Sequence, residues 1–535
     1  MVNNFRAMLS MSAVLALSRV TGYVRTMVAA AVLGTGMVAN AFAVASGLPT
    51  LIYNLFIGGI LWSIFVPLLV ERLIAHGEED AQCLTNALLT LILPFLAVVA
   101  LLGVVFAEPL MHLSTRWEDS AKLSPEVAQE TTRLAVLLFR FSILHVFFYG
   151  IGTVGTGVLN AHRRFFLPAF APVLNNLFAV ACFLGYALLA PKNPGAAVYL
   201  LAATTLGVAV MSLVLLPTMY HLGYRVRPVF GHPGLLPAMR LAGPMLVFVA
   251  AGAGVQVFAT LLATEFNAAP QLGYAFVVFS LPFGIFNIAL ETTLMRELSE
   301  KHARRDTEGY REILSAGLRT MAFITVPASV GLITLATPTI GFLYQRGRFT
   351  AEDTRVVANI LVAYSVGLLG YSTYSFLIRA SYSRQNTKTP ALLNVGLFAL
   401  YVVLAYGLSR VVGLVGMPLA VSMTYAILAL FSLEATRREI KGLRSQRLLR
   451  SLVKILIAGV AMYAVGLGGT SLLGTGSSTP ERVLILAVVG GVSLVAYLGV
   501  AFLLKAEELK PAVALLRRRV IKVEDQKGAL EQGQR

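Results

Sequence analysis

Apolar runs near twenty residues or longer repeat along this chain of 535 residues. They are not amphipathic, and their length matches the roughly 30 Å hydrocarbon core of a bilayer, so they predict spanning helices and not barrel strands. We expect about fourteen spans, at residues 8–33, 38–70, 83–108, 130–158, 166–190, 196–221, 241–268, 271–296, 314–344, 353–379, 389–410, 414–435, 451–474 and 481–504. The second is too long for one straight span, and we expect Gly47-Leu48-Pro49 and Gly58-Gly59 to bend or break it. The predicted fold class is an all-α polytopic membrane protein.

Composition and charge placement agree with this class. Hydrophobic residues make up 57% of the chain and charged residues 13%, and the mean hydropathy is +0.77. The net charge of +17 is concentrated in the loops after even-numbered spans, which is the positive-inside pattern and not a nucleic-acid-binding one. We therefore expect both termini to be cytoplasmic and no nucleic-acid partner. One basic turn, Gln345–Phe349, falls on the predicted outer side.

A weak internal repeat suggests two halves of six spans each. Leu48-Pro49 to Asn54 echoes Leu281-Pro282 to Asn287, and Pro168-Ala169 echoes Pro390-Ala391. Halves with an even number of spans have the same orientation in the membrane, and transport sites in such folds lie between them. The predicted organisation is an N-terminal lobe at 1–222, a cytoplasmic linker at 223–240, a C-terminal lobe at 241–436, two further helices at 451–505, and a cytoplasmic tail at 506–535. For the tail, an amphipathic surface helix and a solvated segment remain open alternatives.

Two arginines inside the first span are the leading candidates for a binding site. Arg19 and Arg25 would together cost about 5–7 kcal/mol near the bilayer centre, so such residues usually face a bundle interior or a watery cavity. On a helix Ser18 shares a face with Arg25, and Arg19 lies on its shoulder about 9 Å along the axis. The pattern predicts a cationic cavity for a negatively charged ligand, and the alternative is a snorkelling or structurally paired arginine.

Other intramembrane polar residues have open roles. Glu265 and Glu291 would pair with an arginine, bind a coupling cation, or lie at a solvated rim. Asn40, Asn54 and Asn287 would hydrogen-bond a glycan or cap broken helices. We find no phosphate-binding loop, no nucleophile elbow and no histidine pair at metal spacing, so neither an enzyme nor a metal site is predicted. We interpret His145 as a satisfied interior histidine, and Cys83 and Cys182 as packing residues without a disulfide.

Several spaced motifs carry a family resemblance. They are Ser18-Arg19-Val20-Thr21-Gly22-Tyr23-Val24-Arg25, Asn40-Ala41-Phe42 through Leu48-Pro49 and Phe65-Val66-Pro67, Leu159-Asn160-Ala161 through Pro168-Ala169 and Asn175, Leu343-Tyr344 through Asp353-Thr354, Ala363-Tyr364-Ser365 through Leu368, and Tyr382 through Pro390. With these motifs the chain resembles the MurJ/MviN family of lipid II flippases, in the multidrug/oligosaccharidyl-lipid/polysaccharide exporter superfamily. The resemblance covers nearly the whole chain in order.

The resemblance implies a V-shaped, two-lobed, alternating-access bundle in the bacterial cytoplasmic (inner) membrane. Its substrate would be lipid II, or another undecaprenyl-diphosphate-linked glycan, moved from the inner to the outer leaflet. Arg19 and Arg25 would hold the pyrophosphate, while Ser18, Asn40 and Asn54 would meet sugar or peptide. No cofactor is expected beyond a coupling ion, Na⁺ or H⁺, or the membrane potential. Anionic phospholipids and cell-wall synthesis proteins are the expected partners.

The chain departs from the family pattern at charged positions. Tyr53-Asn54 stands where the family usually has arginines, and Phe276-Val277 where it commonly has Asp-Arg. Thr26 and Asn40 replace family acids, so cations and anions are lost together, which avoids unpaired buried charge. Three alternatives stay open: a divergent lipid II flippase or a paralogue for another lipid-linked glycan, a cation-coupled multidrug exporter of the same superfamily, and a non-transporting membrane scaffold or regulator.

Overall fold

The computed structural model describes residues 2–53, 65–443 and 445–509, apart from the side chains at 2–12, 52–53, 236–246 and 445. Within these residues the chain is helical, with no β-strand. Ten of the described helical stretches are long and apolar enough to span a membrane, or eleven if α17 and α18, which meet at a 48° bend, form one span. The all-α polytopic class is therefore confirmed. Apart from the expected second span at 38–70, part of which lies outside the described residues, each expected span coincides with one helix or with consecutive helices. The count of fourteen stays a prediction.

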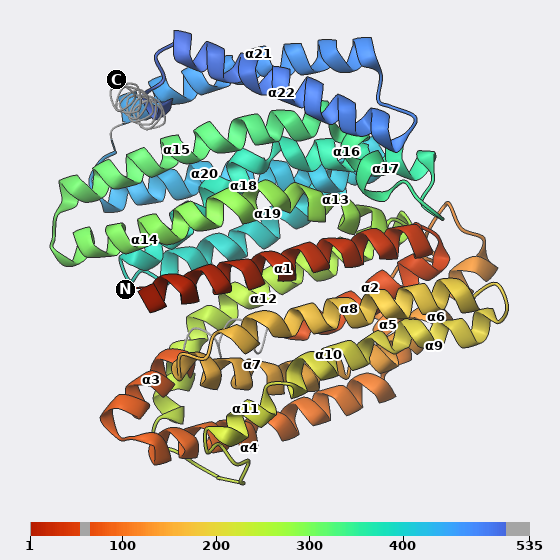
Figure 1. Cartoon of the computed structure of the whole chain (residues 1–535), viewed down its shortest axis with the longest axis vertical. Coiled ribbons are helices and arrows are strands. Elements are labelled where there is room, and N and C mark those ends of the chain that lie inside the picture. Colours follow the sequence, from red (N-terminus) through yellow and green to blue (C-terminus); the bar gives the residue numbers. More distant parts are fainter. Residues whose placement is uncertain (1, 54–64, 444, 510–535) are drawn as a thin grey trace, which may run out of the picture. The chain divides into compact units, whose positions relative to one another are not determined.

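The described chain divides into two compact units. The first runs to Tyr274 and adds Leu343–Val357 and Thr387–Met417, and the second contains the remainder. The helices of the first unit are α1 (Val2–Leu33), α2 (Met37–Tyr53), α3 (Val66–Ala75), α4 (Glu78–Val105), α5 (Ala107–Ser114), α6 (Pro125–Ser142), α7 (His145–Ala161), α8 (Phe166–Leu189), α9 (Pro194–Ala202), α10 (Thr204–Leu213), α11 (Leu216–His221), α12 (Leu235–Glu265), α19 (Lys388–Val412) and the 3₁₀ turn η4 (Gly413–Val415) (Figure 1).

The second unit contains the π-helical turn η3 (Phe283–Asn287), α14 (Ile288–Ala303), α15 (Thr307–Thr334), α18 (Leu368–Ser383), α21 (Ser445–Leu473), α22 (Thr479–Leu503) and the 3₁₀ turn η5 (Glu507–Leu509). Four helices have residues in both units: α13 (Ala269–Pro282), α16 (Ala336–Tyr344), α17 (Ala351–Val366) and α20 (Gly416–Glu439). The lobe boundaries expected at 222 and 241 stay a prediction. Of the expected tail, only η5 and its neighbours lie within the described residues.

The predicted linker is a packed part of the first unit. The backbone N–H of Val229 donates to Thr90 Oγ1 of α4 at 3.0 Å, and His232 Nε2 lies 3.1 Å from Asp80 Oδ1 at the start of α4. Helix α12 then begins at Leu235, earlier than the expected 241. These bonds satisfy polar groups of the connection, which a buried backbone requires.

Helix α2 continues through Pro49 to Tyr53, so the break expected at Gly47-Leu48-Pro49 does not occur. The Ser46 hydroxyl donates to the Phe42 carbonyl at 2.7 Å, and Thr50 to the Ser46 carbonyl at 3.3 Å. A membrane helix can accommodate an internal proline, and α2 extends on both sides of Pro49. Gly58-Gly59 lies outside the described residues.

The basic turn Gln345–Phe349 packs against the end of α1 through main-chain contacts in the first unit. The Arg348 N–H donates to the Ala31 carbonyl at 2.7 Å, and Tyr274 Oη donates to the Gly34 carbonyl at 3.1 Å. Gly347 has φ +57°, and a Cβ there would lie 2.3 Å from the Ala31 carbonyl oxygen. Only glycine permits both this backbone conformation and this close approach.

In the second unit, α21 and α22 form an antiparallel pair, the blue helices of Figure 1. A capping box between Ser478 and Glu481 begins α22. The buried Arg482 donates to the carbonyls of Gly341, Gly476 and Ser477 at 3.0, 3.1 and 3.3 Å. This guanidinium joins the start of α22 to α16.

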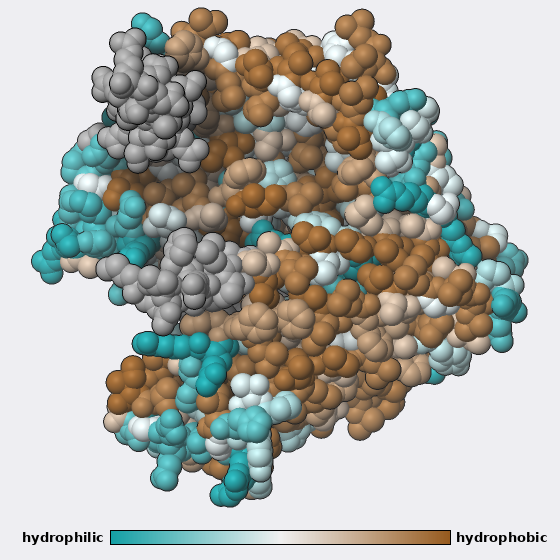
Figure 2. Space-filling view, in the orientation of Figure 1, coloured by the Kyte–Doolittle hydropathy of each residue, from teal (hydrophilic) through white to brown (hydrophobic). Residues whose placement is uncertain are grey.

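The surface has the distribution expected of spanning helices. Figure 2 shows hydrophobic residues over the flanks of the helices and hydrophilic residues gathered toward their ends. Exposed apolar side chains on α21 and α22 include Val460, 68% exposed, and Leu503, 77% exposed. In a soluble protein such surfaces would mark an interaction site, whereas in a bilayer they face lipid.

Candidate functional site

Arg25 lies on α1, which packs against α8 in the first unit. Its side chain is half-buried and within electrostatic range of His145 and Tyr149, both on α7. His145 is buried, its Nε2 lies 3.1 Å from Thr205 Oγ1, and its ring meets Tyr149 edge-on. The interpretation of His145 as a satisfied interior histidine is therefore confirmed, and its ring forms part of the surroundings of Arg25.

Asn176 of α8 holds α1 in place one turn before Arg25. Its Nδ2 donates to the Ser18 carbonyl at 3.2 Å and lies 3.1 Å from Thr21 Oγ1. A Cβ on Gly22 would come only 3.5 Å from this amide. The sequence analysis missed Asn176, although an adjacent pair of asparagines inside an apolar span is a signal that could have identified it.

A cavity of about 230 Å³ opens beside this junction, between α7, α8 and α10. Tyr149, Thr153 and Thr156 contribute its polar groups, and Pro168 and Pro172 lie on the α8 side. Tyr149 thus connects the cavity wall with Arg25. The described lining residues include neither acidic nor basic side chains, so a preference for an anion would have to come from Arg25.

The structure brings some of the predicted site residues together and separates others. Arg19 is exposed on α1 and within electrostatic range of Tyr23. Ser18 is half-buried, and its carbonyl is bonded to Asn176. Asn54 lies outside the described residues. No described contact therefore supports a sugar or peptide site at these positions, and their role in binding stays a prediction.

Asn40 has a structural position. It is fully buried, and its Nδ2 donates to the carbonyls of Thr35, Gly36 and Asn267 at 2.9, 3.1 and 3.3 Å. Its Oδ1 accepts from the Ala269 N–H at 3.1 Å. The amide thus joins the start of α2 to the turn before α13, which is the structural alternative that the sequence left open. Its assignment to substrate stays untested.

The two candidate coupling carboxylates each lie against an arginine. Arg410 of α19 forms a two-armed pair with Glu265 at the end of α12, at 2.5 and 3.2 Å. Glu291 of α14 is buried, and its Oε2 lies 2.6 Å from Nε of Arg379 on α18. Either carboxylate would have to exchange its arginine for a coupling cation before binding one. Among the described residues no group of three or more metal-ligating side chains is found, and Cys83 and Cys182 are free thiols.

Phe276, at one of the positions where this chain departs from the family pattern, packs among aromatic rings in the second unit. Phe276 is 41% exposed, and its ring lies 5.7 Å from that of Tyr364 and 5.7 Å from that of Phe279. Such edge-on and tilted pairs stabilise one another without charge. An aromatic surface therefore stands where the resemblance predicts the charged residues Asp-Arg.

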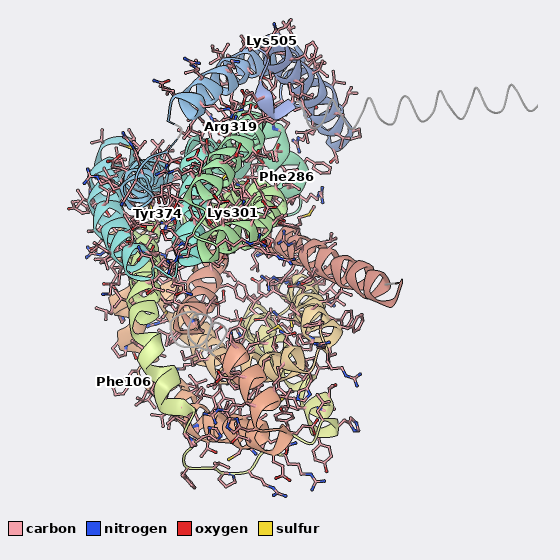
Figure 3. The ribbon with its side chains drawn as sticks, turned by 90° about the vertical axis from the view of Figure 1, so that its left-hand side faces the viewer. Phe106, Phe286, Lys301, Arg319, Tyr374 and Lys505 are labelled. Carbon is pink, nitrogen blue, oxygen red and sulfur yellow. The ribbon has the colours of Figure 1, made fainter. Side chains whose placement is uncertain are left out.

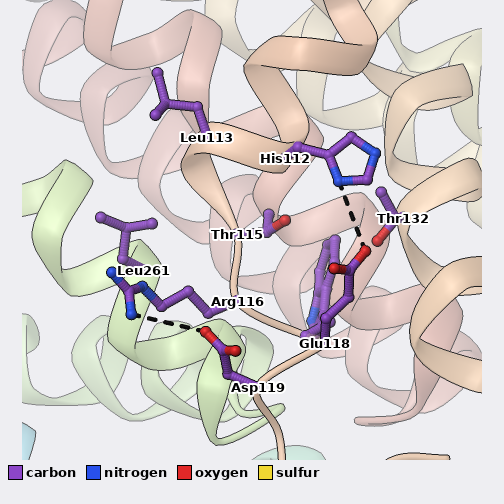
Figure 4. Close-up of a pocket in the computed structure, with 9 residues that line it drawn as sticks. His112, Leu113, Thr115, Arg116, Glu118, Asp119, Thr132 and Leu261 are labelled. Atoms are coloured by element: carbon purple, nitrogen blue, oxygen red, sulfur yellow. Dashed lines mark ion pairs between the residues drawn. The ribbon is translucent and has the colours of Figure 1, made fainter. Parts of the chain in front are cut away.

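A second cavity in the first unit, of about 360 Å³, is lined by charged loop residues (Figure 4). His112 lies 3.7 Å from Glu118, and Arg116 lies 3.7 Å from Asp119. The Arg116 N–H also donates to Thr264 Oγ1 at 2.9 Å. These exposed pairs contribute little binding energy on their own, so this cavity does not compete with Arg25 as an anion site.

Comparison with solved structures identifies the fold. A structure of lipid II flippase MurJ in an inward closed conformation matches with a TM-score of 0.74 at 22% identity, covering 94% of this chain and 99% of that one. An inward-facing multidrug resistance transporter of the MATE family, in the MOP superfamily, matches with a TM-score of 0.59 at 15% identity over 81% of this chain and 94% of that one. The fold is that of a multi-span membrane transporter.

The sequence comparisons give the family. The family model described as lipid II flippase MurJ matches residues 29–485, and the chain belongs to this family. It is 28% identical over 476 residues to lipid II flippase MurJ of Burkholderia cenocepacia, covering 87% of this chain and 90% of that one. It is 30% identical over 508 residues to the probable lipid II flippase MurJ of Bdellovibrio bacteriovorus, covering 92% and 93%. The predicted resemblance is confirmed, and the chain is a transporter and not an enzyme.

Proposed function

We propose that this chain translocates lipid II from the inner to the outer leaflet of the bacterial cytoplasmic membrane, with both of its termini in the cytoplasm. Membership of the lipid II flippase MurJ family supports the proposal, since the match spans most of the chain. The observation that carries the assignment of the site is Arg25, half-buried beside α7 and a cavity without acidic lining among its described residues.

In this proposal Arg25 binds a phosphate of the lipid-linked diphosphate. The planar guanidinium can present two N–H groups to two phosphate oxygens, and it remains charged at every physiological pH. Arg19, six residues earlier on α1, provides a second cation nearer the helix start. The undecaprenyl tail stays in the bilayer throughout, so the cavity need accept only the polar part of the substrate.

The driving force is proposed to be the membrane potential or a gradient of Na⁺ or H⁺. Moving one charge across 100 mV is worth about 2.3 kcal/mol. Glu265 and Glu291 are the proposed charge-coupling residues, and their pairing with Arg410 and Arg379 means that an ion would act by releasing a guanidinium. Anionic phospholipids and cell-wall synthesis proteins are proposed as partners.

A second candidate substrate is another undecaprenyl-diphosphate-linked glycan. The aromatic surroundings of Phe276 favour this alternative, because an aromatic face suits the apolar face of a sugar ring better than an ion pair does. The anion site at Arg25 would be common to both substrates.

Complementation tests both the function and the site. A bacterium depleted of its only lipid II flippase would express the wild type, Arg25→Ala, or Arg133→Ala as a matched control at an exposed arginine of α6. We expect rescue by the wild type and the control but not by Arg25→Ala at equal membrane abundance. Rescue by Arg25→Ala would refute the site while keeping the function. Failure of a well-inserted wild type would refute lipid II as the substrate, and other polyprenyl-linked glycans would then be tested.

A further inference from the structure

A cavity of about 700 Å³ lies at the first turns of α21 in the second unit, and none of its described lining residues belongs to the proposed transport site. Its lining includes Arg447, Arg450, Ser451 and Lys454 of α21 and Glu507 of η5. The three cations lie at positions i, i+3 and i+7, so they share one face of the helix. Three basic side chains thus converge on one concave surface, together with a single acid.

That acid is already neutralised by other groups. Glu507 Oε2 accepts from Arg447 Nε at 2.9 Å and from Arg319 Nη1 of α15 at 2.6 Å. Figure 3 labels Arg319 on α15 and Lys505 just beyond α22. These hydrogen bonds hold the pKa of Glu507 below its ordinary value, so the carboxylate stays charged and bonded to the two arginines.

The remaining positive charge belongs to Arg450 and Lys454. Arg450 is exposed and Lys454 is half-buried, and the Lys454 ammonium has one described acceptor, the Lys505 carbonyl at 3.3 Å. An ammonium can donate three hydrogen bonds and a guanidinium five. The cavity therefore retains strong donors and an excess of positive charge among its described residues.

The surface of α21 beyond the cavity is apolar. Val453, Leu456, Ile457 and Val460 are all exposed, by 47, 49, 49 and 68%. Ten residues of helix separate Arg450 from Val460, or about 15 Å, which is half the thickness of the hydrocarbon core. The cationic cavity thus lies at the membrane interface, and beside it an apolar surface of α21 extends for about the thickness of one leaflet.

We propose that this cavity binds the phosphate headgroup of an anionic membrane phospholipid, with its acyl chains along α21. Basic pockets at the ends of membrane helices suit such headgroups, and the convergence of the three cations distinguishes this cavity from a basic loop that only sets topology. This proposal rests on the anionic phospholipids named as partners in the proposed function and gives them a binding site. Binding here does not depend on which lipid the chain transports, so each can fail without the other.

The test measures binding of a fluorescent phosphatidylglycerol to the purified full-length protein in neutral detergent. The cavity variant is Arg450→Gln/Lys454→Gln. The matched control is Arg437→Gln/Arg438→Gln, which removes the same charge from exposed arginines of α20 that pair with Glu434 on the same helix. Two interfacial cations account for roughly a 30-fold change in affinity. We expect a loss of that order in the cavity variant, little change in the control, and weak binding of phosphatidylcholine to all three proteins.

Three results would overturn the proposal. The first is equal weakening in the cavity variant and the control, which would indicate a general effect of charge. The second is equal affinity for phosphatidylcholine in the wild type. The third is displacement of the fluorescent lipid by undecaprenyl diphosphate at lower concentrations than by unlabelled phosphatidylglycerol, which would make the occupant a transport substrate. Arg450→Gln alone, at an exposed position, provides a milder variant whose weaker binding is also expected.

Discussion

Replacing Glu291 and replacing Arg379 should destabilise the second unit by different amounts, although either change breaks the same ion pair. Glu291 is completely buried on α14, while the Arg379 side chain on α18 is 37% exposed. Arg379→Met leaves a carboxylate in an apolar interior without its partner, whereas Glu291→Gln leaves a guanidinium that still reaches the surface. The burial of the group left behind determines the cost.

Removing one partner of a buried pair costs about 3–5 kcal/mol. Because Arg379 is partly exposed, solvent weakens the pair, and we expect about 3 kcal/mol for Arg379→Met. Glu291→Gln should cost about 1 kcal/mol, since the amide keeps the shape and some of the hydrogen bonding. In the double variant no buried charge is left alone, so it should be more stable than Arg379→Met.

The free energy of unfolding would be measured by titrating detergent-solubilised protein with sodium dodecyl sulfate, for the wild type, both single variants and the double variant. The cycle isolates the coupling between the two side chains. We expect a coupling of about 2 kcal/mol or more, with the double variant recovering part of the loss. Additive costs, with the double variant least stable, would refute the argument that the unpaired buried carboxylate is what destabilises Arg379→Met.

Three further predictions concern the ends of the helices. Two arginines lower the pKa of Glu507. The stability that its carboxylate contributes is therefore present above the ordinary pKa of a glutamate and is lost as the pH falls through the lowered pKa. In that acidic range the melting temperature of Glu507→Gln should vary less with pH than that of the wild type. Asp306 caps α15 through the Gly309 N–H, so Asp306→Ala should lower the unfolding free energy by about 1 kcal/mol, and Asp306→Asn, which can still cap, should lower it less. Gly347→Ala would place a Cβ 2.3 Å from the Ala31 carbonyl oxygen, whereas a Cβ on Gly36 would have no atom within 4 Å. We expect Gly347→Ala, but not Gly36→Ala, to lower the melting temperature. Equal melting temperatures for the two variants would show that the turn accommodates the Cβ without loss of stability.

The class of fold could be predicted from the sequence because the length and polarity of the spans are local properties. The bilayer imposes a fixed thickness on each apolar run, so the expected spans that lie wholly within the described residues coincide with helices. Helix boundaries were less accurate. At Pro49 the expected break is absent, since a membrane helix can accommodate proline.

The partners within the candidate site could be predicted only in part. The cost of a buried charge identified Arg25, Glu265 and Glu291 as residues that need a partner, but not which partner. Glu265 and Arg410 lie 145 residues apart in the chain, and no local pattern connects them. For Asn40 the sequence could not distinguish a ligand-binding amide from a structural one, because both have the same chemistry. The four hydrogen bonds to the backbone show the structural role.

Arg482 joins α22 to α16 through carbonyl groups alone among its described hydrogen bonds. A guanidinium keeps its charge at any pH a cell meets, and a carbonyl has no proton to gain. These three bonds therefore contain no group whose protonation state changes with pH. While carboxylate pairs elsewhere in the chain respond to acidity, the three bonds should keep the same strength in acidic and neutral surroundings.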